Sequence, residues 1–512
     1  MKTGGARLVA AGILLSRVFG LVRQRVTAHY LGAGVVADAL SAAFRIPNLL
    51  QNLLGEGALS ASFIPVYAKL LAEGKREDAG RVAGAIVALL SALVSVVVVI
   101  GIVTAPWLVG LIAPGLDSET RELTVLLVRI IFPGLGLLVV SAWCLGVLNA
   151  HGRFFLSYAS PVLWNAAIIV ALLYAGANEA STQTQLAVAV AVASVAGAAL
   201  QLVVQVPTVL RVEGGLRLRA GPAAAHIRAV LHNFGPSVAT RGVVQVSAYV
   251  DTLIASLLGV GALATLTYAQ AISMLPVSLF GMSVAASELP AMSGATGSGA
   301  EIAAALRARL DRGLRRIVYF VIPSAVGMLV FGRMMASVLY EGGAFGRDDA
   351  VWVWAALAGS AVGILAGTMG RLYSSASFAL GDTRTPFRFA TVRVAVAAVL
   401  GAVLATQLPA RLGLPTQLGV GFLTAGSGVA AWLEYHLLRR YVESRIGRVD
   451  LPAVLLWKIW LATVLAALVG RVVAWQVGSL APLFEGVLVL GSFGGAYVLF
   501  TQLLRVSRAR SA

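Results

Sequence analysis

Long apolar stretches follow one another along the whole chain, and short polar segments separate them. A helix that crosses a bilayer needs about 20 mainly apolar residues, and these stretches reach that length. We interpret fourteen of them as transmembrane helices, and we expect the second and the eighth to be bent or to cross only partly. They lie near residues 8–31, 35–68, 82–107, 122–148, 157–176, 186–210, 229–257, 262–290, 316–338, 351–373, 386–406, 417–438, 453–474 and 483–504.

The composition excludes a large soluble enzyme. Of the 512 residues, 59% are hydrophobic and 12% are charged, and the mean hydropathy is +0.88. A soluble domain contains about 25% charged residues. The predicted fold class is therefore an all-α polytopic membrane protein. The five histidines are scattered, Cys144 is the single cysteine and no Walker-type phosphate loop occurs, so we expect no enzymatic site, no metal centre and no ATP binding.

The positive charges are distributed unevenly between alternate loops. About 27 of the 39 Lys and Arg residues lie in one set of loops and at both ends of the chain, whereas the opposite loops carry about five. The positive-inside rule then predicts that both termini are cytoplasmic. The net charge of +17 accordingly reflects topology and contact with anionic lipid, and we expect no nucleic-acid partner. Arg17 interrupts the first apolar stretch, which we interpret as an uncleaved helix.

The chain also repeats itself weakly. "LGAG" at 31–34 resembles "LGVG" at 258–261, and "RIPNLL" at 45–50 resembles "MLPVSL" at 274–279. Two further pairs have similar offsets, so we predict two pseudo-symmetric lobes of six helices that share one orientation. The predicted domains are 1–225, 226–448 and, for two additional helices with a cytoplasmic tail, 449–512. Two such lobes favour alternating access, and a channel is the weaker alternative because a fixed pore needs no such repeat.

Several charged residues fall inside the predicted spans. In the second span, Asp38, Arg45, Asn52 and Glu56 follow one another at intervals of 7, 7 and 4 residues, which places them on one helix face. Pro47 lies in this polar stripe and should bend the helix there. Seven arginines lie inside the predicted spans, so the uneven charge of the loops does not explain them. They are Arg17, Arg23, Arg25, Arg45, Arg129, Arg241 and Arg371.

A charge at bilayer depth is costly unless it is paired or hydrated. Asp38 with Arg45, and Glu56 with an arginine of the first span, are possible internal pairs. The first two spans carry four arginines against two acids, however, so such pairing leaves positive charge over. An excess of arginine favours an anionic substrate, and phosphate in particular. Asp251 is either a site for a coupling cation, or an internal pair or solvated acid of a cavity.

Three segments resemble the MurJ (MviN) family of bacterial lipid II flippases, which belongs to the multidrug/oligosaccharidyl-lipid/polysaccharide exporter superfamily. They are "SRVFGLVR" at 16–23, the stretch from Gly32 to Leu70 and "GDTRTP" at 381–386. The resemblance implies a cavity between two lobes, in which arginines hold the diphosphate-sugar headgroup, and a groove for the polyprenyl tail beside the last two helices. It also implies that Arg17, Arg23, Asp38, Arg45 and Glu56 are functional residues.

The sequence departs from the family pattern at two positions. Gln51, before Asn52, and Ala271 stand where many members have arginine. We expect Arg241 and Arg45 to compensate. The expected function is to flip lipid II, a peptidoglycan precursor, from the cytoplasmic to the outer leaflet of the bacterial inner membrane. We expect no cofactor, with coupling to a monovalent cation or to the membrane potential. The expected partners are the polyprenyl-diphosphate lipid substrate, membrane lipids and other cell-wall synthesis proteins.

Four alternatives stay open at this point. A flippase for another polyprenyl-diphosphate-linked glycan would use the same chemistry. A non-transporting paralogue would explain the two absent arginines. A drug or cation exporter would want an acidic cavity, which the excess of arginine disfavours. A membrane scaffold is disfavoured by the intact basic residues of the first span.

Overall fold

The computed structural model describes residues 3–213, 224–282, 284, 288, 292, 299–478 and 481–506. Across these residues the regular structure is helical, and the one β-bridge joins Gly342 to Phe345. The all-α fold class is thereby confirmed. By packing, the chain divides into a first unit of residues 1–256 with 342–345 and a second unit of 257–341 with 346–512.

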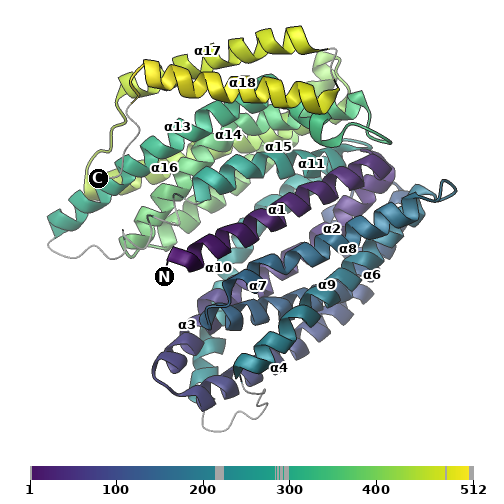
Figure 1. Cartoon of the computed structure of the whole chain (residues 1–512), viewed down its shortest axis with the longest axis vertical. Coiled ribbons are helices and arrows are strands. Elements are labelled where there is room, and N and C mark those ends of the chain that lie inside the picture. The colour runs from purple at the N-terminus through teal and green to yellow at the C-terminus, as the bar shows by residue number, and fades with distance from the viewer. Residues whose placement is uncertain are drawn as a thin grey trace. The chain divides into compact units, whose positions relative to one another are not determined.

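Ten helices form the first unit (Figure 1). They are α1 (Thr3–Leu31), α2 (Val35–Leu54), α3 (Glu56–Ala72), α4 (Arg76–Val103), α5 (Ala105–Ile112), α6 (Ser118–Ala150), α7 (Phe154–Ala159), α8 (Pro161–Gly176), α9 (Gln183–Glu213) and α10 (Ala224–Ser256). Seven further α-helices and two short helical segments of other types are described in the second unit. They are α11 (Ala262–Pro276), η2 (Val277–Met282), α13 (Gly299–Tyr340), α14 (Arg347–Ala379), α15 (Arg384–Leu412), η3 (Thr416–Leu418), α16 (Gly419–Ile446), α17 (Ala453–Val477) and α18 (Pro482–Leu503).

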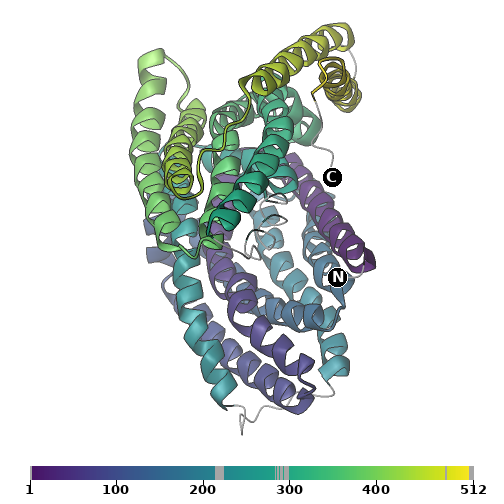
Figure 2. The ribbon, with the colours of Figure 1, turned by 90° about the vertical axis from the view of Figure 1, so that its left-hand side faces the viewer.

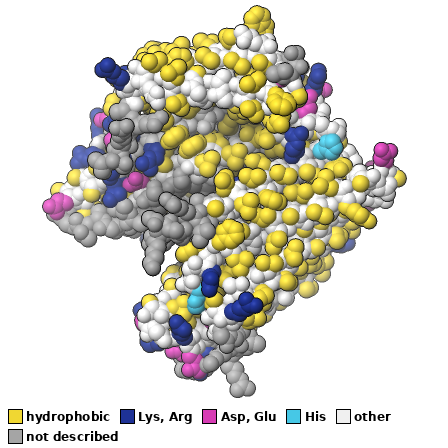
Figure 3. Space-filling view, in the orientation of Figure 1, with side chains coloured by type: hydrophobic (Ala, Val, Ile, Leu, Met, Phe, Trp, Pro, Cys, Tyr) yellow, Lys and Arg dark blue, Asp and Glu magenta, His cyan; other side chains and the backbone are white. Residues whose placement is uncertain are grey.

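Every predicted span coincides with a helix or a pair of helices. Within the described residues, ten helices are long and apolar enough to cross a membrane. The four remaining predicted spans lie on α1, on α2 with α3, on α10 and on α16. In each unit, hydrophobic side chains cover the helix flanks seen in Figure 3, and Lys and Arg gather towards helix ends. Such flanks suit contact with lipid tails.

The second predicted span is divided between two helices, and the eighth changes its helix type; that they are bent or cross only partly stays a prediction. The second breaks at Gly55 between α2 and α3, while α2 continues through Pro47. A Cβ atom at Gly55 would lie 2.5 Å from the Gln51 carbonyl oxygen, so the break needs a residue without a side chain. The eighth span changes from α-helix to π-helix directly after Pro276. Proline lacks the backbone N–H that would continue the α-helical pattern.

The grouping by packing differs from the boundaries that the repeat predicts. The helix α10, which the repeat assigns to the second half, packs against α2 and α3 and belongs to the first unit. The short segment 342–345 also groups with the first unit, where the Ala344 amide donates to the His29 carbonyl over 2.7 Å. The last two helices group with the second unit. Packing and repeat are different properties, so the three-part division at 225 and 448 stays a prediction.

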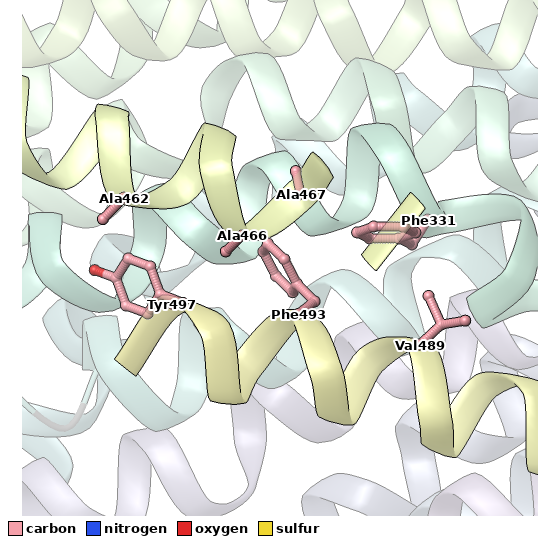
Figure 4. Packing of buried hydrophobic residues seen from close by; sticks show 7 residues of the cluster. All are labelled: Phe331, Ala462, Ala466, Ala467, Val489, Phe493 and Tyr497. Atoms are coloured by element: carbon pink, nitrogen blue, oxygen red, sulfur yellow. The ribbon is translucent and has the colours of Figure 1, made fainter. Parts of the chain in front are cut away.

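The two C-terminal helices pack on α13. Both ribbon views show α17 and α18 lying together beside this helix (Figures 1 and 2). Their contact is a cluster of apolar side chains in which small residues of α17 admit the aromatic rings of the other two helices (Figure 4). Its members are Phe331, Ala462, Ala466, Ala467, Val489, Phe493 and Tyr497. The Tyr497 hydroxyl donates to the Tyr319 carbonyl oxygen at 2.5 Å, so its polar tip is satisfied.

Candidate functional site

The arginines of α1 occupy different faces of that helix. Arg17 and Arg25 are exposed, whereas Arg23 is half-buried. Gly12, Arg23 and Tyr30 recur at intervals of 11 and 7 residues, which brings them to one face at 3.6 residues per turn. This is the face on which α1 runs beside α7 and α8 (Figure 1). Arg17 and Arg23, six residues apart, therefore project about 120° apart around the helix.

Arg23 lies over an aromatic ring. Its guanidinium carbon is 4.7 Å from the centre of the Trp164 ring on α8. A cation in this position is attracted by the negative face of the ring. Trp164 in turn meets Phe44 of α2 edge to face, with ring centres 6.0 Å apart. The structure thus fixes one α1 arginine through an aromatic residue that the sequence analysis did not identify.

Two polar residues of α2 lie on the same recess as Trp164. Gln51 is half-buried and, with Asn48, lines a narrow recess that also includes Trp164. Asn52 is exposed. Arg23, Gln51 and Trp164 therefore come together in the first unit although they lie on three helices. The amides of Asn48 and Gln51 line the recess, and the Arg23 guanidinium lies on the Trp164 ring that borders it; both kinds of group can donate hydrogen bonds to an anion.

Arg45 lies against α10. Its Nε donates to the Thr252 hydroxyl over 2.8 Å, and the Tyr249 hydroxyl donates to the Arg45 carbonyl over 3.0 Å. Asp251, the half-buried neighbour of Thr252, is close enough to interact electrostatically with this guanidinium. Arg45 thereby links α2 to α10 within the first unit. Its predicted role in holding a substrate, and the coupling role of Asp251, stay predictions.

Asp38 is buried in the first turn of α2, with 3% of its surface exposed. A carboxylate there is stabilised by the partial positive charge of the helix N-terminus. Two predicted site residues have side chains outside the described part of the structure: Glu56, at the start of α3, and Arg241, in α10. Across the residues that are described, no group of three or more His, Cys, Asp and Glu residues could hold a metal ion.

A second polar cluster lies at the loop ends of α3, α6 and α9. The Tyr67 hydroxyl and His151 Nε2 are 2.8 Å apart, and the same nitrogen is 3.7 Å from a carboxylate oxygen of Glu213. Burial, together with the charge of Arg76, holds the pKa of His151 below its ordinary value. The neutral imidazole that results fits a hydrogen-bonded strut between helices.

The "GDTRTP" segment at 381–386 starts α15. The Asp382 carboxylate accepts hydrogen bonds from the Arg384 and Thr385 amides, from the Thr385 hydroxyl and from Tyr441 on α16. These donors hold the pKa of Asp382 well below its ordinary value, because they stabilise the carboxylate form. The segment therefore has a capping function that explains its aspartate and threonine.

The second unit contains an apolar groove of about 960 Å³ between α11, η2, α13, α17 and α18. Aromatic and aliphatic side chains such as Phe280, Phe320 and Phe493 line it. Arg315 and Arg316 on α13 are its charged lining residues, and Arg315 is paired with Asp311 over 2.7 Å. A groove of this size and polarity can accommodate a long hydrocarbon chain. No motif in the sequence alone indicated these lining residues; only the family resemblance implied a groove there.

Comparisons with known proteins agree with one another. A family model described as "Lipid II flippase MurJ" matches residues 27–494. A protein of Burkholderia cenocepacia named lipid II flippase MurJ is 32% identical over 441 residues, which cover 85% of this chain and 82% of that protein.

Solved structures resemble the chain as well. A lipid II flippase MurJ in an inward closed conformation has a TM-score of 0.76 at 22% identity and covers 97% of this chain and 98% of its own. An inward-facing multidrug resistance MATE transporter of the MOP superfamily has a TM-score of 0.68 at 14% identity and covers 83% and 95%. At these identities the two likenesses concern the fold.

Proposed function

The chain belongs to the lipid II flippase MurJ family, and from this premise we propose that it carries lipid II from the cytoplasmic to the outer leaflet by alternating access. Membership makes the protein a multi-pass transporter of the bacterial cytoplasmic membrane. Lipid II unites a diphosphate-sugar head with a long polyprenyl tail, so its carrier must bind a charged group and a hydrocarbon chain. The geometry of each unit supports one of these tasks.

The headgroup is held by the arginines of the first unit. The observation that carries this proposal is the position of Arg23, whose guanidinium lies over the Trp164 ring, and Trp164 also lines the recess beside α2. Arg17, exposed on the neighbouring face of α1, supplies a second guanidinium. Arginine binds phosphate oxygens with two parallel hydrogen bonds, which suits a diphosphate.

The tail is held by the apolar groove of the second unit. Burying a methylene group stabilises the bound state by about 0.8 kcal/mol, so a polyprenyl chain gains affinity along the whole groove. Two of the helices that form the groove, α17 and α18, follow the second predicted lobe and have no partner in the repeat. Their presence is explained if they serve the tail.

The membrane potential provides a driving force that needs no ATP. With both termini in the cytoplasm and a potential that is negative inside, an anion moving outward gains about 2.3 kcal/mol per charge per 100 mV. A diphosphate that carries two charges across alone gains about 4–5 kcal/mol. Return of the empty, positively charged site towards the cytoplasm is favoured by the same field. Coupling to a monovalent cation through Asp251 is the second possible source of energy.

Complementation tests this proposal. Cells depleted of their own lipid II flippase are supplied either with this chain or with its Arg17→Ala variant. The matched control is Arg121→Ala, which changes an exposed arginine at the start of α6. We expect growth and lipid II export with the unchanged chain and the control, and lysis with Arg17→Ala. Lysis with the unchanged chain, present at normal level in the membrane, contradicts the proposal. A paralogue with another substrate, which Gln51 and Ala271 allow, would then be the better interpretation.

A further inference from the structure

Three charged residues lie near one another on α14, α15 and α16 of the second unit, away from the residues that line the apolar groove. Arg393 on α15 and Glu434 on α16 are paired, with 2.9 Å between Nε and a carboxylate oxygen. Arg371 on α14 interacts electrostatically with both of them. The cluster contains two guanidinium groups and one carboxylate, so one positive charge is left over.

The cluster lies at membrane depth. Arg371 is eight residues before the end of α14 and Arg393 is nine residues after the start of α15, which places both about 12–14 Å from the helix ends. Glu434 is twelve residues before the end of α16, about 18 Å from it. These three ends are on the same side, because consecutive helices run in opposite directions. An excess positive charge at this depth is costly unless an anion or water reaches it.

The surroundings of Arg371 leave room for a ligand. The residue is exposed, and its Nε makes a long hydrogen bond of 3.4 Å to the Gly367 carbonyl of its own helix. Gly367 lies one turn away on the same face, and a Cβ atom there would meet no other atom within 4 Å. The open face beside Arg371 is therefore both accessible and positively charged.

We propose that Arg371, with Arg393 and Glu434, binds the phosphate group of a lipid. Arginine forks match phosphate oxygens, and basic pockets between transmembrane helices bind anionic headgroups near the cytoplasmic surface. Glu434 orients Arg393 and neutralises one of the two positive charges of the site. The phosphate comes either from a bilayer phospholipid or from the transported lipid. The site deepens the proposed function only in the second case.

Binding to the purified full chain in phosphatidylcholine bilayers separates these sources. One probe is phosphatidylglycerol and the other is undecaprenyl diphosphate, and native mass spectrometry reports the affinity of each. Arg371→Gln removes charge-assisted hydrogen bonds and should weaken binding of the true ligand about tenfold or more. Arg371→Lys should restore part of it, because the charge remains and the fork is lost. Arg411→Gln, an exposed residue in the last turn of α15, is the control and should change nothing.

Glu434→Gln distinguishes a phosphate site from an internal strut. It raises the charge of the cluster from one excess positive to two, so a phosphate ligand should bind more tightly. If Arg371→Gln weakens the binding of phosphatidylglycerol alone, the site belongs to bilayer lipid. If it weakens the binding of undecaprenyl diphosphate alone, the site belongs to the transported lipid. If neither probe responds to Arg371→Gln or to Glu434→Gln, the proposal is wrong, whether or not the variants unfold at lower temperature. Because transport is not measured, failure here leaves the flippase function untouched.

Discussion

Arginines on α1 and α2 of the first unit lie against an aromatic ring and hydroxyl groups, whereas the groove of the second unit is lined mainly by aliphatic and aromatic side chains. Both units are built from long apolar helices, so the difference lies in a few residues. In the first unit these residues are arginines that contact partners on other helices, and in the second they line a space of about 960 Å³. Under the proposed function, head and tail of one lipid would be recognised by separate parts of the chain.

The largest effect is expected from the arginines of α1. Arg17→Ala or Arg23→Ala should lower lipid II transport tenfold or more, because each lost charge-assisted hydrogen bond to a diphosphate costs about 1.5–3 kcal/mol. Lysine at either position should restore transport only in part. Transport into vesicles, at equal amounts of inserted protein, measures the effect. Full activity of both alanine variants would remove the first unit from headgroup binding.

Filling the groove should have the next largest effect. Gly494 lines the groove, and a Cβ atom there meets no atom within 4 Å, so Gly494→Phe can extend a ring into the space without moving the backbone. Displacing two to four methylene groups of a tail costs about 1.6–3.2 kcal/mol, which corresponds to a loss of affinity of roughly tenfold to two-hundredfold. Gly495→Phe is the matched control, because its neighbourhood is equally open and it does not line the groove. Equal transport by the two variants would show that the groove is not used.

Substitution of Arg241 tests whether a helix other than α1 and α2 also contacts the headgroup. If Arg241 compensates for the arginine absent at Ala271, Arg241→Ala should lower transport several-fold, up to the tenfold expected for one lost charge-assisted bond. Adding Ala271→Arg to that variant should restore activity. A substrate favours closure only through contacts that differ between states, which a second contact would provide. If neither change has any effect, these two positions contribute nothing to the headgroup site.

The smallest effect is expected from the ring beneath Arg23. Trp164→Leu removes a cation–π contact of about 0.5–1 kcal/mol and should weaken headgroup binding about two- to fivefold while the charge of Arg23 remains. Trp107→Leu on α5, whose side chain is 68% exposed, is the control. A loss as large as that of Arg23→Ala would mean that the ring is essential for placing the guanidinium.

Much of the fold follows from the spacing of apolar residues. Each predicted span contains helix, and the second is divided between two helices. The break in the second span lies at Gly55, eight residues beyond the proline that was expected to bend it, because α2 accommodates Pro47 while no side chain fits beside Gln51 at position 55. Local composition thus predicts the presence of a helix break more reliably than its position.

The candidate site is only partly visible in the sequence. The arginines stand out because charge is rare in apolar spans, but their partners lie far away in the chain. Trp164 is 141 residues from Arg23, and Thr252 is 207 residues from Arg45. No periodicity within one helix reports such contacts, since they depend on which helices pack together. Pairing of Arg45 with Asp38 of the same helix was one alternative, and the structure places a hydroxyl and an acid of α10 beside Arg45.

Lipid binding tests the separation of head and tail most directly. The affinity of the purified chain is measured for undecaprenyl diphosphate and for undecaprenol, which has the same tail without the phosphates. We expect Arg23→Ala to weaken binding of the diphosphate about tenfold and to leave undecaprenol unchanged. Gly494→Phe should weaken binding of both ligands. If Arg23→Ala weakens both ligands equally, or Gly494→Phe weakens neither, head and tail are not recognised by these two parts of the chain.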